Sequence, residues 1–418
     1  MKTILFIFRS FNDVDHMTPL FDESLNQPDL RILISCINPY FDIKNDFRLN
    51  FIKHKHNVKI EYIYNLDPHS LFHKLFILVT DTVCRNSLLN NFGPLKALLS
   101  KIRMRLYSSR VMEQLFDSKW AHDLIRHQQI GAVVVDYVDE TRFIYSSINT
   151  AAKAMSIPII GVPHGFDSAA NDYWTLAGLE KQNNQRMHEN WGWIDELIVA
   201  SCDIKTKYSR MGLNPSKMTV LGSPRFSKKW CETYFTLIGE NTLDRNPDST
   251  KIIFFDHSSR YRSHPDDILE SLTEIDNLPF TDLVIKPHTR EQLSDERLKY
   301  IGRIDNSHST HLIQWSDIVI NYMSSIIFDA YYFDKIFIYP NHFNDNTMRW
   351  EKYNACWTVN SNEEIVDTIN KIHLGQFDIP YSSTNVNTFL FDQVYGSSED
   401  QDVSTKYLTH IKSLTQAY

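Results

Sequence analysis

Short apolar runs that end in polar turns recur along the chain and alternate with segments of helical spacing. In the first half, such runs predict strands at 3–8, 30–37, 58–64, 131–136, 157–162, 196–200 and 218–222. In the second half, they predict strands at 251–256, 282–286, 317–321, 335–340 and 355–359. Helical spacing at 143–156 and 203–212 falls between strands. This alternation, repeated twice, predicts an α/β protein with two Rossmann-like, doubly wound domains facing each other across a cleft.

The domain boundaries are predicted from a polar stretch and from length. A chain of 418 residues is too long for one ordinary core. The stretch GENTLDRNPDST at 239–250 is the linker candidate. We therefore expect an N-terminal domain at 1–238, a C-terminal domain at 251–395, and a final helix at 396–418 that packs back on the N-terminal domain.

Composition narrows the class of protein. A net charge of -8 argues against a nucleic-acid binder, because phosphate contacts supply most of that affinity. The five cysteines lack CxxC or CxxH spacing, so neither a zinc site nor a disulfide framework is indicated. The opening run MKTILFIFRSF is short and interrupted by Arg9, which favours a buried strand over a signal peptide. No apolar run approaches a membrane span, so we expect a protein that does not cross a bilayer. The composition and the scattered cysteines favour a cytoplasmic enzyme.

Four segments in the second part of the chain join an apolar run to a polar turn: IPIIGVPHG, VLGSPR, LVIKPHTRE and DIVINYMSSIIFDAYY. Parallel strands deliver such turns to the carboxyl edge of a sheet, where open α/β folds bind ligands. The side chains there are cations, imidazoles and hydroxyls, which suit a phosphorylated ligand. They are His164, Ser223, Arg225, Lys286, His288, Ser324 and Ser325.

The HG, GxPR, KPH and SSxxFD motifs in these segments resemble GT-B glycosyltransferases, especially the branch of CDP-glycerol glycerophosphotransferases and capsule polysaccharide enzymes. The last two motifs also resemble the HP and serine motifs with which bacterial sialyltransferases hold a CMP-sugar, although Thr289 replaces the proline of that motif. The resemblance covers about 157–360. It implies a metal-independent enzyme without a cofactor, whose substrate is a CMP-, CDP- or UDP-linked sugar.

The donor site is expected on the second domain. The resemblance implies that His288 contacts the donor phosphate, with Lys286 nearby. Ser324 and Ser325 are expected to open a helix, either as an ordinary cap or with free N–H groups facing phosphate. Arg225, beside Ser223, would clamp a phosphate or an acceptor carboxylate, or else form an interdomain salt bridge. The loop after strand 251–256 adds two arginines that could cradle phosphate: Arg260 and Arg262.

The catalytic base is expected on the first domain. His16 and Pro19 have the HxxP spacing of many GT-B enzymes, which predicts an exposed His16 at a helix start, although Asp15 replaces the usual glycine. A neutral imidazole can deprotonate a sugar hydroxyl. His164 is the second candidate and Asp139 the third. Other nearby carboxylates could take the role: Asp13, Asp15, Asp136 and Glu140.

Segment 95–110 combines apolar residues at helical spacing with positive charges only. An amphipathic basic helix can lie on an anionic membrane surface, here the inner face of the plasma membrane. The alternative is a helix that packs its apolar stripe into the core.

The expected function is transfer of a sugar from a nucleotide donor to a glycan or lipid-linked acceptor, in capsule, lipopolysaccharide O-antigen or teichoic-acid-like biosynthesis. The expected chemistry is inverting displacement at the anomeric carbon. Three alternatives remain open. They are a CDP-glycerol or CDP-ribitol polyol-phosphate transferase, a non-hydrolysing nucleotide-sugar epimerase, and an inactive scaffold subunit of a polysaccharide assembly complex.

Overall fold

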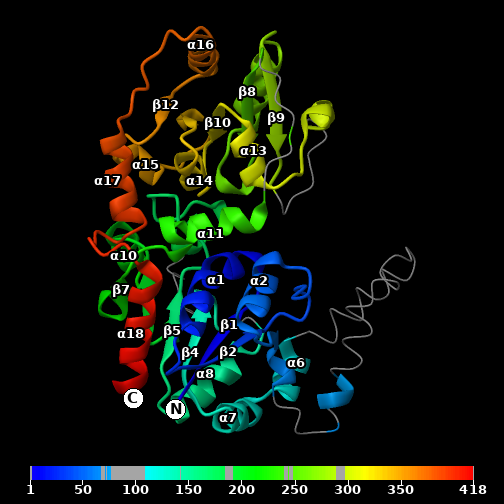
Figure 1. The fold of residues 1–418 in the computed structure, drawn as a ribbon, viewed down its shortest axis with the longest axis vertical. Coiled ribbons are helices and arrows are strands. Elements are labelled where there is room, and N and C mark those ends of the chain that lie inside the picture. The colour runs from blue at the N-terminus through cyan, green and yellow to red at the C-terminus, as the bar shows by residue number, and fades with distance from the viewer. Residues whose placement is uncertain are drawn as a thin grey trace.

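A computed structural model describes residues 2–66, 71, 73–76, 109–141, 143–183, 192–239, 243, 248–288 and 297–417. It contains a seven-stranded sheet of order β3-β2-β1-β4-β5-β6-β7 and a five-stranded sheet of order β12-β11-β10-β8-β9. Figure 1 shows the two sheets in separate halves of an elongated molecule, each with helices around it. The predicted α/β architecture with two Rossmann-like domains is confirmed.

The first domain is built around the seven-stranded sheet, whose strand pairs all run parallel. The strands are β1 (Thr3–Phe8), β2 (Arg31–Cys36), β3 (Glu61–Tyr62), β4 (Ile130–Asp136), β5 (Ile159–Val162), β6 (Glu196–Val199) and β7 (Met218–Val220). The helices are α1 (Phe11–Leu25), α2 (Phe47–His56), α6 (Ser109–Leu115), α7 (Ser118–His127), α8 (Tyr145–Ala154), α9 (Leu176–Asn183) and α10 (Cys202–Arg210). Short 3-10 turns lie at η1 (Ile63–Asn65) and η2 (Pro215–Lys217).

The second domain is built around the five-stranded sheet, which is also parallel. Its strands are β8 (Thr250–Phe255), β9 (Thr281–Lys286), β10 (Ile318–Asn321), β11 (Ile336–Pro340) and β12 (Trp357–Val359). Its helices are α12 (Pro265–Asp276), α13 (Ser309–Trp315), α14 (Ile327–Tyr332), α15 (Arg349–Lys352), α16 (Asn362–His373) and α17 (Ser383–Gln393). The 3-10 turns are η4 (Ser259–Tyr261), η5 (Arg297–Arg303) and η6 (Asn341–Phe343).

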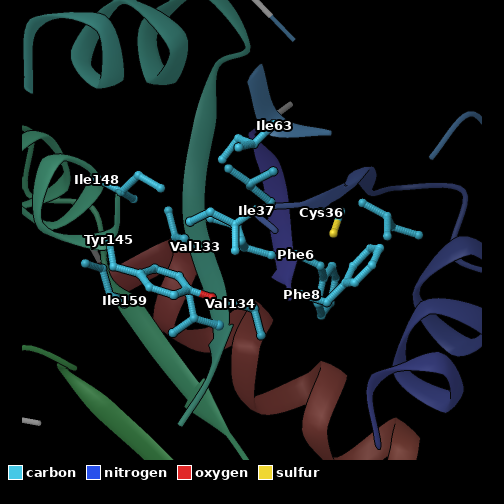
Figure 2. Close-up of a cluster of buried hydrophobic side chains, with 14 of the residues drawn as sticks. Phe6, Phe8, Cys36, Ile37, Ile63, Val133, Val134, Tyr145, Ile148 and Ile159 are labelled. Atoms are coloured by element: carbon cyan, nitrogen blue, oxygen red, sulfur yellow. The ribbon is translucent and has the colours of Figure 1, made fainter. Parts of the chain in front are cut away.

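The central strands are apolar over most of their length because helices cover both faces of each sheet. Every residue of β1, β4 and β8 is buried. In Figure 2, Tyr145 and Ile148 of α8 point toward Val133 and Val134 of β4, while Phe6 and Phe8 belong to β1 beside it. This rigid centre fixes the places where β1 and β4 end, and those ends carry the site described below.

The chain passes between the domains twice. After β7 it forms η3 (Pro224–Phe226) and α11 (Lys228–Ile238) and enters the second sheet at β8. After α17 it returns as α18 (Val403–Ala417), which contacts α1 and β4. The two passages touch where Ser223 N donates to Val394 O at 2.7 Å. Gly222 has φ +99°, and a Cβ there would lie 2.3 Å from Val394 O, so this crossing requires glycine.

Two local predictions are wrong. His16 does not lie exposed at a helix start, because α1 begins at Phe11 and the first turn is closed by Asp13, which accepts from Ser10 N at 2.8 Å. His16 is therefore in the second turn and only 7% exposed, and Pro19 lies inside the helix. The serine pair does not open α14 either, since the helix begins at Ile327 after a turn that contains both serines.

Most of the predicted membrane-facing segment 95–110, namely 95–108, lies outside the described residues. Among the helices that the structure describes, none combines the length and the apolar character needed to cross a bilayer.

Candidate functional site

A cavity of about 700 Å³ lies between the two domains, at the carboxyl edges of both sheets. The first domain contributes side chains that follow β1, β4 and β5, and the second contributes side chains that follow β8, β9 and β10. The polar residues of this lining from the second domain are His257, Tyr261, His288, Ser324 and Ser325, and those from the first are Arg9, Asn12, Tyr137, Asp139, His164, Asp167, Ser168, Tyr173, Lys181 and Tyr208. The structure therefore brings five of the predicted site residues to the cavity: Asp139 and His164 on the first-domain wall, and His288, Ser324 and Ser325 on the second-domain wall.

A cluster of charged or ionisable side chains forms the first-domain wall. Arg9 Nε donates to Asp136 Oδ2 at 2.8 Å, and its backbone N donates to Asp13 Oδ2 at 2.9 Å. His164 Nδ1 makes a short hydrogen bond to Asp13 and lies 3.3 Å from Asp136 Oδ2. Tyr145 donates to the other oxygen of Asp136 at 3.0 Å. Both carboxylates are fully buried, whereas the His164 side chain is 31% exposed.

This arrangement orients the imidazole of His164. Its Nδ1 faces the two carboxylates, so the opposite edge of the ring, which carries Nε2, is the part that reaches the cavity. A buried carboxylate that fixes Nδ1 is how proteins select one histidine tautomer and leave Nε2 for proton transfer.

The same contacts shift the protonation of the cluster. Burial disfavours a charged imidazole, but the charge and hydrogen bond of Asp13 outweigh it and raise the pKa of His164 to about 9. Burial also opposes ionisation of Asp13, yet the neighbouring His164 lowers its pKa below the ordinary value. Burial and then the charge of Asp13 raise the pKa of Asp136. The cluster therefore favours an imidazolium beside an ionised Asp13.

The donor atoms of Asp13, Asp136 and His164 lie within 4.8 Å of one another, a spacing that can hold a metal ion. Arg9 already places its guanidinium against this set, 2.8 Å from Asp136 and 3.3 Å from His164 Nδ1. The cluster thus has an internal cation that balances the two carboxylates, and its chemistry is that of an oriented acid and base.

The second-domain wall is built from imidazole and hydroxyl groups. His257 is half-buried, with its Nε2 3.3 Å from Asn321 Oδ1, and its backbone N donates to the Tyr322 hydroxyl at 3.0 Å. Burial, and then the proximity of His288, lower the pKa of His257 to about 3, so it is neutral at physiological pH. The His288 ring lies 5.9 Å from that of His257.

Asn321 fixes the turn that carries the serine pair. Its Oδ1 accepts from the backbone N of Met323 at 3.2 Å and of Ser324 at 2.9 Å, and its Nδ2 donates to Ser324 O at 2.8 Å. Ser324 Oγ in turn accepts from Ile326 N at 3.3 Å. The hydroxyls are thereby held at the cavity by a side chain at the end of β10 and by a turn.

The remaining predicted residues near the cavity are engaged by local contacts. Lys286 is not part of the lining, because it is buried at the end of β9 and donates to Ser307 O at 2.7 Å. Arg260 is exposed and donates to the hydroxyl of the neighbouring Tyr261 at 2.6 Å. Asp139 does line the cavity, and its Oδ1 accepts from Thr141 N at 2.9 Å.

Four more predicted site residues gather in or beside a second buried cluster. Arg225 donates from Nε to Asp15 Oδ2 at 2.8 Å, and Asp15 also accepts from Arg48 at 2.9 Å. His16 sets its ring against Phe226 at 5.7 Å, and burial lowers its pKa to about 4. Ser223 is buried beside Arg225. None of these residues is among those that line the 700 Å³ cavity.

No motif in the sequence marks Arg9, Asp136 and Tyr145 as a group. A signal was nevertheless present, because Arg9 directly follows the first predicted strand and Asp136 ends the fourth. These strands are β1 and β4, which pair side by side in the sheet. Adjacent strands of a parallel sheet bring such end residues together, but the order of the strands has to be known first.

No family model and no curated protein matches the sequence. Solved structures do match over the full length. S. aureus MnaA in a structure with UDP is 14% identical, with a TM-score of 0.57 and coverage of 100% of this chain and 98% of that chain. The UDP-GlcNAc 2-epimerase from Neisseria meningitidis bound to UDP-GlcNAc is 12% identical, with a TM-score of 0.57 and coverage of 99% and 100%. Anabaena HepE in complex with UDP and glucose is 11% identical, with a TM-score of 0.52 and coverage of 99% and 100%.

Likeness at such low identity establishes the fold. The predicted GT-B-type fold of two Rossmann-like domains is confirmed by these neighbours and by the two parallel sheets. The narrower resemblances, to the CDP-glycerol branch and to bacterial sialyltransferases, receive no support from these neighbours and stay predictions.

Proposed function

We propose that this GT-B-type protein is a metal-independent glycosyltransferase that uses a nucleotide-activated sugar to build a surface glycan. One observation carries the proposal. A single cavity has an oriented histidine with buried carboxylates on one wall and hydroxyl and imidazole groups on the other. An acceptor hydroxyl and an anionic donor need these two kinds of wall, held at a fixed separation.

The first wall supplies the base. Nε2 of His164 accepts the proton of the acceptor hydroxyl while the acceptor oxygen bonds to the anomeric carbon and the bond from that carbon to the nucleotide phosphate breaks. Asp13 holds Nδ1 and stabilises the imidazolium that forms. Because the active form is the neutral imidazole and the pKa of His164 is about 9, turnover should increase with pH through the neutral range.

The second wall receives the donor. Ser324, Ser325 and His288 line the cavity and offer hydrogen bonds to the phosphates of the leaving nucleotide. UDP is the first nucleotide to test, because MnaA was solved with UDP and HepE with UDP and glucose. Burial keeps His257 neutral, and its ring lies 5.9 Å from that of His288.

A second candidate function is epimerisation of a UDP-sugar. It is favoured by the full-length structural match to the Neisseria UDP-GlcNAc 2-epimerase. The same cavity would then hold one nucleotide sugar, and the first wall would move a proton at a ring carbon with no glycan acceptor.

A nucleotide panel tests the proposal first. Thermal unfolding of the wild type is measured with CMP, CDP, UDP, GDP and dTDP, each with and without magnesium. Ligand at a hundredfold excess over its dissociation constant stabilises a fold by about 2.7 kcal/mol, so the cognate nucleotide should stand apart from the others. Selective stabilisation by UDP without magnesium supports the proposal, and CDP would favour the polyol-phosphate transferase. A chain that binds none of the five would favour the scaffold subunit.

The reaction is then followed by NMR with the matching nucleotide sugar. Release of nucleotide that requires a glycan acceptor, with inversion at the anomeric carbon, is the expected result. Appearance of the C2 epimer of the donor without any acceptor would replace glycosyl transfer by epimerisation. His54→Ala, at an exposed histidine of α2, is the matched control for variants of His164.

A further inference from the structure

The second buried cluster joins the two domains through Arg225. This residue lies on η3, in the passage between the domains, and its side chain is 4% exposed. Its Nε donates to Asp15 Oδ2 of α1 at 2.8 Å. Asp15 is itself held by Arg48 of α2 at 2.9 Å. Arg225 is therefore anchored to the first domain by a strong, charge-assisted contact.

The other partner of Arg225 belongs to the second domain. Asp329 of α14 has a side chain that is 3% exposed, and its Oδ2 lies 3.6 Å from Arg225 Nη2. The neighbouring rings of Phe226 and Phe328 stack at 4.4 Å across the same boundary. This is an ion pair between the domains in an apolar setting.

The ion pair is incompletely closed in this conformation. A separation of 3.6 Å is longer than a hydrogen bond. Arg225 Nη1 and Asp329 Oδ1 are both buried, and neither has a hydrogen-bond partner within the described part of the chain. Buried charges with unmet hydrogen bonds are costly. A small approach of α14 toward η3 would turn this contact into a direct pair, so the cluster favours a closer arrangement of the domains.

The ion pair also links the two walls of the cavity. Asp15 lies on α1 two residues after Asp13, which orients His164. Ser325 precedes Asp329 by four residues, in the turn that leads into α14. A shift of α14 against α1 therefore moves the serine turn against the histidine cluster.

We propose that Arg225 and Asp329 form an interdomain latch that sets the distance between the two walls of the cavity and tightens when a nucleotide binds. Arg225 is then a positioning residue. Its guanidinium is committed to Asp15 and Asp329, and it is not among the described residues that line the cavity, so it does not contact the donor. This inference goes beyond the proposed function, because it concerns domain closure and holds for any ligand of the cavity.

Asp329→Asn is the central test, because it removes one charge with almost no change of shape. Spin labels at Lys153→Cys on α8 and Lys371→Cys on α16, both exposed, report the interdomain distance by pulsed EPR in a background that carries Cys202→Ser and Cys84→Ser, since Cys84 lies outside the described residues. The parent protein should give a narrow distance distribution that shortens with saturating UDP. Asp329→Asn should broaden the distribution without ligand and weaken UDP binding by about tenfold. Asp334→Asn, at an exposed position just beyond α14, is the matched control and should change neither.

Two variants of Arg225 distinguish a positioning role of this residue from a contribution to overall stability. Arg225→Met should broaden the distance distribution, and Arg225→Lys should restore much of the narrow one, since an ammonium can reach one carboxylate. An Asp329→Asn protein with parental distances and parental UDP affinity would overturn the latch. If the parent protein binds no nucleotide, the proposed function fails. The latch is still tested in that case, because the ligand-free distance distributions of Asp329→Asn and Asp334→Asn can be compared with that of the parent.

Discussion

Two histidines face the same cavity from opposite domains, and their pKa values are shifted in opposite directions. On the first-domain wall, the pKa of His164 is raised to about 9, and on the second-domain wall that of His257 is lowered to about 3. Burial lowers the pKa in both cases. The difference comes from the partners, since His164 has the carboxylates of Asp13 and Asp136, whereas His257 has the amide of Asn321 and a second histidine.

The comparison indicates that the two walls have different roles, proton transfer for the first and phosphate binding for the second. Charges placed within hydrogen-bond distance of one another make the first wall suited to moving a proton. Among the described residues that line the second wall there are hydroxyls and imidazoles but no carboxylate, so a phosphate can approach them. Four substitutions test this division, and we take them in order of decreasing consequence.

His164→Ala should remove the proton-transfer function of the first wall. We expect turnover to fall roughly 10²- to 10⁴-fold, the usual contribution of a positioned acid or base. The dissociation constant for UDP should remain within about twofold, because the second wall is unaltered. Steady-state kinetics and calorimetry measure the two quantities. Full turnover in the variant would place the base elsewhere, with Asp139 as the next candidate.

Arg9→Met should destabilise the first wall as a structure. Arg9 is the internal cation beside Asp136, and its loss leaves a buried carboxylate without its main partner. Breaking a buried pair in this way costs about 3–5 kcal/mol, measured as the free energy of unfolding in urea. Arg31→Met, at an exposed arginine of β2, should stay within about 0.5 kcal/mol of the wild type. Equal stability of the two variants would mean that Arg9 does not neutralise the cluster.

His288→Ala should act on the second wall alone. Loss of one hydrogen bond to a phosphate should weaken UDP binding by about tenfold, or about 1.4 kcal/mol. The free energy of unfolding without ligand should hardly change. Titration calorimetry of the variant and of His54→Ala makes the comparison, and parental affinity in His288→Ala would remove His288 from the donor site.

Asp13→Asn should shift the pH profile. The active base is neutral His164, whose population increases with pH up to its pKa of about 9, so the wild-type rate should increase over this range and then level off. Asp13 stabilises the imidazolium, so its replacement by an amide lowers the pKa of His164. The rising limb should therefore move toward lower pH, while the plateau rate falls because the ring is less well oriented. If the rising limb of the variant stayed at the wild-type pH, the group that titrates would not be His164.

Much of the fold was predictable because it depends on local pattern. Each of the 12 predicted strands overlaps a strand of the structure. Parallel strands buried on both faces must be apolar along their length, and that requirement is visible in the sequence itself. The same reasoning locates the turns that follow these strands, which is why the amino-acid pattern alone singles out His164, His288, Ser324 and Ser325.

The local errors have a local cause. The HxxP spacing placed His16 at a helix start, but Ser10 is the N-cap of α1 and the helix begins at Phe11, so His16 lies in the second turn and faces the protein interior. The serine pair was expected to start α14, yet Asn321 folds it into a turn ahead of the helix. Such boundaries depend on which side chain caps the first turn, and neither the HxxP spacing nor the serine pair specifies that contact.

Local pattern was enough to predict the strands, their alternation with helices and the residues that end each strand. Which of those residues meet is a property of the folded chain. Asp13 and His164 are 151 positions apart, and Asp15 and Arg225 are 210 positions apart. Their contacts follow from strand order, from the depth of burial and from the placement of one domain against the other. The chemistry of a site depends on these distances, because a carboxylate shifts the pKa of a histidine only from within a few ångströms.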